Sequence, residues 1–366
     1  MFRHFHIRSV GKSNFDMNFA HRFSFHFPVG RKGSRTITWS GMETAAPPVR
    51  RRYVIGAYAN SPCLHAWNAD AESIYYEGLK AIDGIRDLEH PFYGTLHRDD
   101  DAWFLDHVKP EWDYVLTCIP GTMQRLAQDP AFGLASTDEG GRQRALEFQH
   151  KAREAVVALN RHLGRQAVMA VQIHSAPTMR TGSEASIAAF ARSLAEIVTW
   201  DWRSARLVIE HCDAFTHAHQ PDKGFLSVDH ELEAIASLPL AARPGMMVNW
   251  GRSAIEGRSV DTPVLHIEKI RAAGALRGLI FSGATATGEA YGAWKDMHIA
   301  PAPAGPDSVL APQSLMTRAE ISRSIRAAGP VDYLGAKVRL LPEPANIETR
   351  LRLIRETIEM LDSAGA

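Results

Sequence analysis

The chain has 366 residues, of which 45% are hydrophobic, and its formal net charge at pH 7 is zero. It has no uninterrupted apolar run approaching the roughly 18 residues of a membrane helix, which argues against a membrane protein. Its three cysteines, Cys63, Cys118 and Cys212, are odd in number and widely spaced, which argues against a disulfide framework and a structural zinc knuckle. We therefore expect one large enzyme-like domain in a reducing cytoplasm.

The charge is unevenly distributed along the chain. Residues 1–52 carry ten Lys or Arg against two acidic residues, a balance of +8, so the remainder carries −8. This first region lacks the apolar segment of a secretory signal. Because terminal segments are commonly disordered unless they are tied down, we interpret residues 1–48 as a basic, disordered extension and residues 49–366 as the folded domain. An organelle transit peptide and a nucleic-acid-binding arm are the alternatives for the extension.

Short apolar segments ending in polar residues recur along the rest of the chain, as expected for buried parallel strands. There are eight of them, at residues 53–58, 84–89, 113–118, 167–174, 206–210, 245–249, 276–282 and 334–340. Segments of helical composition lie between them, at residues 70–81, 141–163, 183–201, 229–237, 262–273, 317–328 and 347–361.

Alternating strands and helices predict an α/β protein built from parallel βαβ units, and eight such units fit a single (β/α)8 TIM barrel. A doubly wound open sheet is the alternative fold. However, no G-x-G-x-x-G turn follows the first strand, so we expect no nucleotide cofactor.

Side chains that can perform chemistry stand at several predicted strand ends, where the active sites of TIM barrels lie. His174 closes the fourth strand and Glu210 the fifth, and the long glycine-rich loop after the seventh contains Asp296 and His298. Two carboxylates and two imidazoles suit zinc, manganese or magnesium, so we predict that these four residues bind a divalent metal. Each also has a purely structural interpretation, such as an ion pair for Glu210 or a buried, hydrogen-bonded ring for His174.

The order of these motifs resembles the xylose isomerase-like barrel superfamily, which includes sugar isomerases and epimerases and the endonuclease IV group. The resemblance runs from about Tyr53 to the C-terminus. It rests on Ile-His at strand four, Val-Ile-Glu at strand five and Lys-Asp-Met-His after strand seven. A poorly characterised bacterial branch is the most similar, through segments 89–92, 173–177 and 335–337.

The chain departs from the superfamily at three positions where metal ligands are usual. Asn249 stands in place of an aspartate at strand six, Ser282 in place of a histidine at strand seven, and Lys337 and Arg339 in place of a glutamate at strand eight, with Glu343 beyond. A neutral amide and a hydroxyl donate less charge to a metal, so these replacements predict weak metal binding or a metal-free site.

The leading hypothesis is a sugar or sugar-acid isomerase or epimerase that transfers a proton next to a carbonyl. Glu210 would be base or ligand, with His174 beside it, and Lys337 would supply positive charge and act as an acid with a pKa lowered by burial. We expect the substrate, a small sugar or sugar derivative, to contact His211, Asp213, Asn249, Trp250, Arg252, Trp294, Lys295 and Arg339. The group His211, Asp213, His217 and His219 is expected to form a polar wall of the site rather than a second metal centre.

Two other functions remain open. Metal-dependent phosphodiester cleavage of the endonuclease IV kind would use the same donors, but a barrel of charge −8 is a poor surface for nucleic acid. A catalytically inactive, ligand-binding barrel would explain the replaced ligand positions. We expect no membrane or nucleic-acid partner, and association with further copies of the chain is left open.

Overall fold

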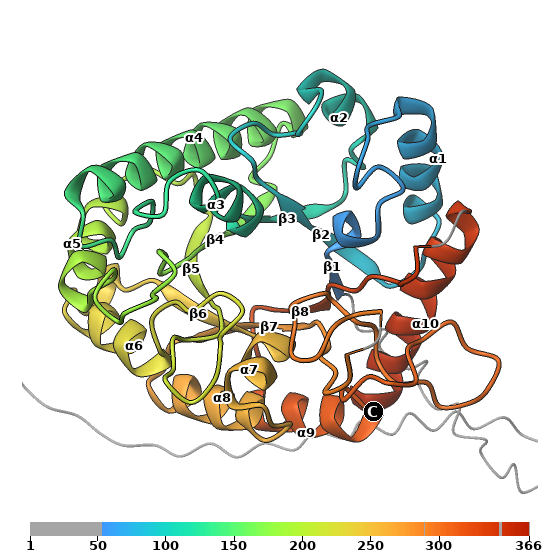
Figure 1. Ribbon diagram of the computed structural model, residues 1–366. Coiled ribbons are helices and arrows are strands. Elements are labelled where there is room, and N and C mark those ends of the chain that lie inside the picture. Colours follow the sequence, from blue (N-terminus) through green and yellow to red (C-terminus); the bar gives the residue numbers. More distant parts are fainter. Residues whose placement is uncertain (1–52, 289, 344–345, 366) are drawn as a thin grey trace, which may run out of the picture. The chain divides into compact units, whose positions relative to one another are not determined.

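The computed structural model describes residues 53–288, 290–343 and 346–365. The predicted disordered extension, residues 1–48, lies outside this part of the chain. Eight parallel strands pair in chain order, and β8 pairs with β1 to close the barrel. The helices surround the strands on the outside (Figure 1). The predicted (β/α)8 barrel is therefore confirmed.

Each strand overlaps one of the predicted segments. The strands are β1 Tyr53–Ile55, β2 Ile85–Pro91, β3 Asp113–Thr117, β4 Val168–Ile173, β5 Arg206–His211, β6 Gly245–Asn249, β7 Leu276–Phe281 and β8 Tyr333–Ala336. β8 ends four residues before its predicted segment does, although the N–H of Lys337 still donates to the Phe281 carbonyl of β7.

Seven of the described helices were expected, while three short ones, α2, α3 and α7, were not. The helices are α1 Ala69–Lys80, α2 Asp101–His107, α3 Ile119–Leu126, α4 Glu139–Leu163, α5 Ile187–Ile197, α6 Val228–Ala236, α7 Trp250–Gly257, α8 Thr262–Ala272, α9 Arg318–Ala328 and α10 Ile347–Gly365, with 3-10 turns η1 Ala57–Asn60 and η2 Leu240–Ala242. Helix α5 begins later than predicted, because Ser186 caps it by accepting a hydrogen bond from the Ala189 N–H.

The interior of the barrel is filled by one side chain from each of seven strands. These buried residues pack together as a cluster apart from the main core, and they are Val54, Val115, Ala170, Val208, Met247, Ile280 and Tyr333. Because side chains alternate along a strand, residues two positions further on face the interior again, closer to the C-terminal end. This alternation places Thr117, Glu210 and Asn249 in the barrel mouth.

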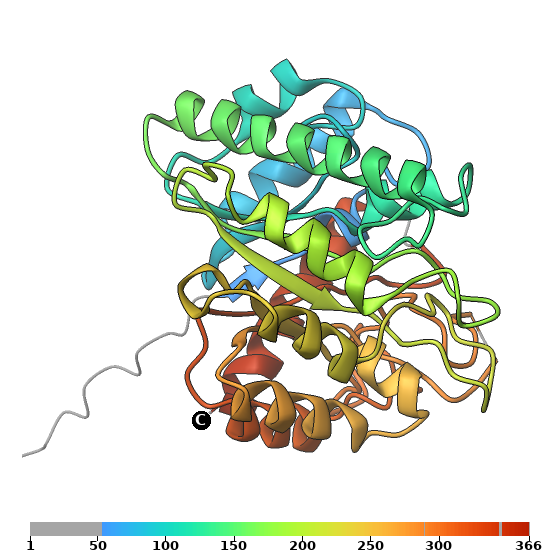
Figure 2. The same cartoon turned by 90° about the vertical axis from the view of Figure 1, so that its left-hand side faces the viewer.

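The long loops gather at the C-terminal ends of the strands (Figure 2). The loop after β5 and the loop after β7 both reach over this end, and Lys223 of the first bonds Asp296 of the second. None of the described helices is long and apolar enough to cross a membrane.

Candidate active site

Glu210 is the centre of a buried polar network in the barrel mouth. Its side chain is fully buried, and its Oε1 lies 2.6 Å from Arg252 Nη1 and 3.3 Å from Lys337 Nζ. Burial alone would raise the pKa of Glu210, but the charges of Arg252 and Lys337 outweigh it and hold that pKa well below its usual range. Glu210 is therefore an ionised carboxylate at neutral pH.

Lys337 joins two carboxylates from different strands. Its Nζ donates to Glu89 Oε1 of β2 at 2.7 Å and to Glu210 Oε1 of β5 at 3.3 Å, with all three side chains fully buried. Burial would lower the pKa of Lys337, but Glu210 and Glu89 raise it above its usual value. The structure thus corrects the predicted acid: Lys337 is a fixed ammonium ion and not a proton donor near neutral pH.

Arg252 connects this network to the loop after β7. Its Nε donates to Asp296 Oδ2 at 2.9 Å, and Lys223 Nζ donates to the same oxygen at 3.0 Å. Asp296 Oδ1 lies 3.1 Å from His298 Nδ1. Burial opposes the ionisation of Asp296, but the neighbouring Lys223 and Arg252 hold its pKa well below its usual range.

His174 has one engaged and one free ring nitrogen. Its Nε2 lies 2.8 Å from Glu210 Oε2, whereas its buried Nδ1 has no hydrogen-bond partner among the described residues. An ionised carboxylate only accepts hydrogen bonds, so Nε2 carries the hydrogen. Burial lowers the pKa of His174 despite the adjacent Glu210, so the ring is neutral at pH 7 and Nδ1 keeps its lone pair.

The predicted metal ligands do not form one cluster. His174 pairs with Glu210, His298 pairs with Asp296, and Arg252 bonds both carboxylates between these pairs. A divalent ion placed there would stand beside Arg252 and Lys337, whose charges already neutralise the carboxylates. The donor set of the mouth therefore does not fit a metal ion, and we derive no step through one.

Of the residues predicted to contact substrate, Asn249 and Arg252 belong to the network. Asn249 Nδ2 donates to Glu210 Oε1 at 3.4 Å. His211 is instead enclosed by two carboxylates outside the barrel wall, and Asp213 Oδ2 accepts backbone N–H groups of residues 222–224. Trp250 is fully buried within the main core.

The remaining predicted contacts lie in the loops. Trp294 packs against the core, Lys295 pairs with Asp222 at 3.1 Å, and Arg339 pairs with Glu343. The predicted polar wall is not assembled either, because His217 is exposed and His219 Nε2 contacts the Glu256 carbonyl at 2.9 Å. Sequence alone could not identify these local partners.

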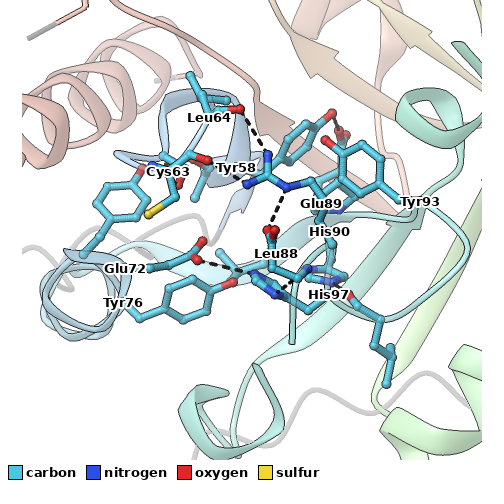
Figure 3. A pocket seen from close by; sticks show the side chains of 17 residues that line it. Tyr58, Cys63, Leu64, Glu72, Tyr76, Leu88, Glu89, His90, Tyr93 and His97 are labelled. Carbon is cyan, nitrogen blue, oxygen red and sulfur yellow. Dashed lines mark hydrogen bonds and ion pairs between the residues drawn. The ribbon is translucent and has the colours of Figure 1, made fainter. Parts of the chain in front are cut away.

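A cavity of about 60 Å³ adjoins the network on the side of β1 and β2 (Figure 3). Its lining includes Glu89 and Tyr58, whose hydroxyl donates to Glu89 Oε1 at 3.4 Å. Further around the wall, His97 Nε2 lies 3.4 Å from Glu72 Oε2, and Arg98 donates to two backbone carbonyls. Glu89 therefore belongs both to the lining of this cavity and to the Lys337 network.

Sequence reasoning missed Glu89, Gln172 and Lys223 as members of this site. The signal for Glu89 was present, since it closes the second predicted strand as Glu210 closes the fifth. Gln172 Nε2 donates to Glu89 Oε2 at 3.4 Å, and its position two residues before His174 on β4 gives the same inward orientation. Lys223 had no such signal, because it reaches Asp296 from a distant loop.

Comparison with known sequences finds relatives that match most of the chain. The sequence profile of a family described as "Domain of unknown function (DUF4862)" matches residues 54–353. A Salmonella typhimurium (strain LT2) protein named "Uncharacterized protein STM3670" is 38% identical over 316 residues, which cover 85% of this chain and 97% of that protein.

Solved structures of a D-tagatose 3-epimerase-like protein and of a D-psicose 3-epimerase share the barrel fold. A D-tagatose 3-epimerase-like protein has a TM-score of 0.53 at 14% identity, covering 86% of this chain and 100% of that one. D-psicose 3-epimerase with D-tagatose from Clostridium cellulolyticum H10 has a TM-score of 0.51 at 11% identity, covering 85% and 98%. These likenesses show a shared barrel fold, and by sequence the chain belongs to the DUF4862 family.

Proposed function

We propose that this protein is an isomerase or epimerase of a sugar or sugar derivative that transfers a proton next to a carbonyl group in the barrel mouth. The observation that carries the proposal is the buried His174–Glu210 pair, in which Nδ1 of the neutral ring has no partner. The fold shared with epimerases of small sugars supports the substrate class.

The first step would be removal of a proton from the carbon beside the carbonyl. Glu210 holds the hydrogen of His174 on Nε2, so the lone pair on Nδ1 is free to accept that proton. The carboxylate also stabilises the imidazolium ion that forms, as an oriented carboxylate does for a catalytic histidine in other enzymes.

Negative charge would then develop on the carbonyl oxygen. Lys337 and Arg252 are buried, permanently charged and held in place by carboxylates, so they need no reorganisation to stabilise an enediolate. In this proposal the two side chains provide the positive charge that a metal ion supplies in other enzymes of enediolate chemistry.

Return of the proton differs between the two reactions. An isomerase can return it to the neighbouring carbon from the same base, once a proton has moved between the two oxygens of the enediol. An epimerase must protonate the opposite face of the same carbon, and this requires a second group that enters the step in its protonated form. Glu89 suits this role, because it lies on β2, contacts Lys337 at 2.7 Å and lines the adjacent cavity. Tyr58, whose O–H donates to Glu89, is available beside it as a hydrogen-bond acceptor for a sugar hydroxyl.

The test is incubation of the full chain with a panel of ketoses, aldoses and their acid derivatives in deuterated water. We expect solvent deuterium to appear at one carbon next to a carbonyl of at least one compound, measured by NMR and mass spectrometry. A compound that raises the melting temperature without any exchange would identify a binding protein instead. Absence of exchange across the whole panel would contradict the proposal.

A further inference from the structure

A second group of buried titratable side chains lies behind the barrel wall. Because neighbouring residues of a strand face opposite sides, Glu210 points into the barrel and His211 points towards the surrounding helices. His211 Nδ1 lies 2.7 Å from Glu231 Oε2 of α6, and its Nε2 lies 2.9 Å from Glu256 Oε2 of α7. His266 of α8 places its Nε2 3.5 Å from Glu256 Oε1.

These contacts have the dimensions of a metal site. One ligand atom each from His211, Glu256 and His266 lies within 4.8 Å of the others. Ligands at about 2.0–2.2 Å from a tetrahedral zinc ion are separated from one another by roughly 3.3–3.6 Å. Glu256 already lies against both histidines, with Oε2 2.9 Å from His211 Nε2 and Oε1 3.5 Å from His266 Nε2, so small side-chain adjustments would bring one oxygen and two nitrogens to that separation.

The outer contacts of the two histidines are those that orient metal ligands. His211 Nδ1 bonds Glu231, and His266 Nδ1 lies 3.0 Å from Ser253 Oγ. Both rings therefore direct Nε2 at Glu256, as in the carboxylate–histidine arrangement that fixes the tautomer of zinc ligands. The Ala214 N–H orients Glu256 by donating to Oε2 at 2.9 Å.

The charge of this group favours a divalent cation. Glu231 is fully buried and Glu256 is largely buried, and within the described ranges both have only histidines as ion-pair partners. Without a metal ion, a protonated His211 offsets only one of the two negative charges of Glu231 and Glu256. A divalent ion with neutral histidines would offset both, which matters because unpaired charge is costly in a buried position.

We propose that His211, Glu256 and His266 bind a divalent metal ion of the zinc class, separate from the barrel mouth. Two imidazoles and one carboxylate are typical zinc ligands, and the side chain of Glu256 is 18% exposed, so solvent reaches it and can supply water as the fourth ligand.

The ion would position the active site without contacting substrate. His211 follows Glu210 on β5, and Glu256 lies one helical turn after Arg252 on α7. Metal binding would therefore tie together the two elements whose side chains meet at 2.6 Å in the barrel mouth.

The test is titration of the metal-stripped full chain with Zn²⁺ by calorimetry and with Co²⁺ by visible spectroscopy. We expect one ion per chain, a tetrahedral Co²⁺ spectrum and a rise in melting temperature on Zn²⁺ addition. Glu256→Gln and His266→Gln should each weaken binding by at least about tenfold. The matched controls Glu268→Gln and His217→Gln, both exposed, should bind like the wild type.

Two further variants make the result decisive. Asp296→Asn alters the barrel mouth, so it should leave Zn²⁺ affinity unchanged. Ser253→Ala removes only the contact to His266 Nδ1 and should lower affinity by roughly 10- to 100-fold, even if a ligand variant does not fold. Absence of stoichiometric binding, binding unaffected by all three site variants, or binding lost only in Asp296→Asn would each overturn the proposal.

Discussion

Individual charges in the barrel mouth decide which residues can perform chemistry. Lys337 and Arg252 keep Glu210 ionised, and Glu210 in turn fixes the tautomer of His174. The lowered pKa makes Glu210 itself a weak base, so the carboxylate acts through the histidine. The role of base, which the sequence assigned first to Glu210, therefore passes to His174 in the proposed mechanism.

Removing the ammonium of Lys337 should affect both stability and activity. In Lys337→Met, Glu89 and Glu210 lose a shared buried partner, so we expect the free energy of unfolding to fall by about 3 kcal/mol or more. Exchange of substrate hydrogen should also be lost. Lys295→Met is the control, because Lys295 is half exposed, and it should change stability by less than about 0.5 kcal/mol. Denaturant unfolding measures the free energy of unfolding of both variants. Equal values for Lys337→Met and Lys295→Met would contradict a stabilising role for Lys337 between the two buried carboxylates.

The carboxyl group of Asp87 gives a pH-dependent prediction. Burial raises the pKa of Asp87 to about 6, with Asp113 adding to the effect against the opposing charge of Arg86. Because the pKa of Asp87 is higher in the folded than in the unfolded protein, the protonated carboxyl group favours the folded state. This contribution is complete below the unfolded pKa, near 3.9, and it is lost as the pH rises through about 6.

Replacing Asp87 by asparagine should therefore stabilise the protein at neutral pH. We expect Asp87→Asn to raise the free energy of unfolding at pH 7.5 by about 1–3 kcal/mol, since the amide has no ionisation penalty. Near pH 3.5 the variant and the wild type should have the same stability. Urea unfolding at both pH values is the measurement, and a variant less stable at pH 7.5 would show that the carboxylate is favourable there.

At the scale of elements, the strands were more predictable than the loops and short helices. Apolar segments ending in polar residues identified all eight strands, because burial on both faces leaves a local signal. Helix α7 left no comparable signal over its eight residues, yet it supplies Arg252 and Glu256. Contacts such as Arg252 with Glu210 join distant segments, so no local pattern could reveal that one arginine pairs with both carboxylates predicted as metal ligands.

The alternation of side chains along β5 contained information that the sequence interpretation did not use. Consecutive strand residues point to opposite faces, so Glu210 and His211 cannot both line the mouth. The same argument, applied to β2, would have placed Glu89 inside the barrel beside Lys337.

Closure of the barrel depends on the absence of a side chain at Gly335. A Cβ there would lie 1.8 Å from the carbonyl oxygen of Val54, the residue it pairs with on β1. We expect Gly335→Ala to destabilise the protein by about 3 kcal/mol or more, because the obstacle is backbone and cannot rotate away. Gly305→Ala is the control, since a Cβ at Gly305 meets nothing within 4 Å. Comparable melting temperatures for the two variants would refute this account of barrel closure.

For the whole molecule, charge separates the sugar hypothesis from the nucleic-acid hypothesis. The chain beyond residue 52 carries eight more acidic than basic residues, which is unfavourable for holding a phosphate backbone. We expect the full chain to show no specific affinity for an abasic DNA duplex over an intact one, with any binding through the basic first 52 residues being weak and abolished by salt. Fluorescence anisotropy across salt concentrations measures this, and salt-resistant preference for the abasic duplex would favour the endonuclease reading.

The central claim is that His174 transfers a proton while Glu210 orients it. The most direct measurement is the rate of deuterium incorporation into the sugar identified by the panel, compared between the wild type and His174→Gln. The glutamine amide can still donate to Glu210 but offers no base, so we expect a melting temperature within a few degrees and a rate at least about 100-fold lower. His162→Gln, an exposed change on α4, should exchange like the wild type. A folded His174→Gln protein that retains the wild-type rate would contradict the account.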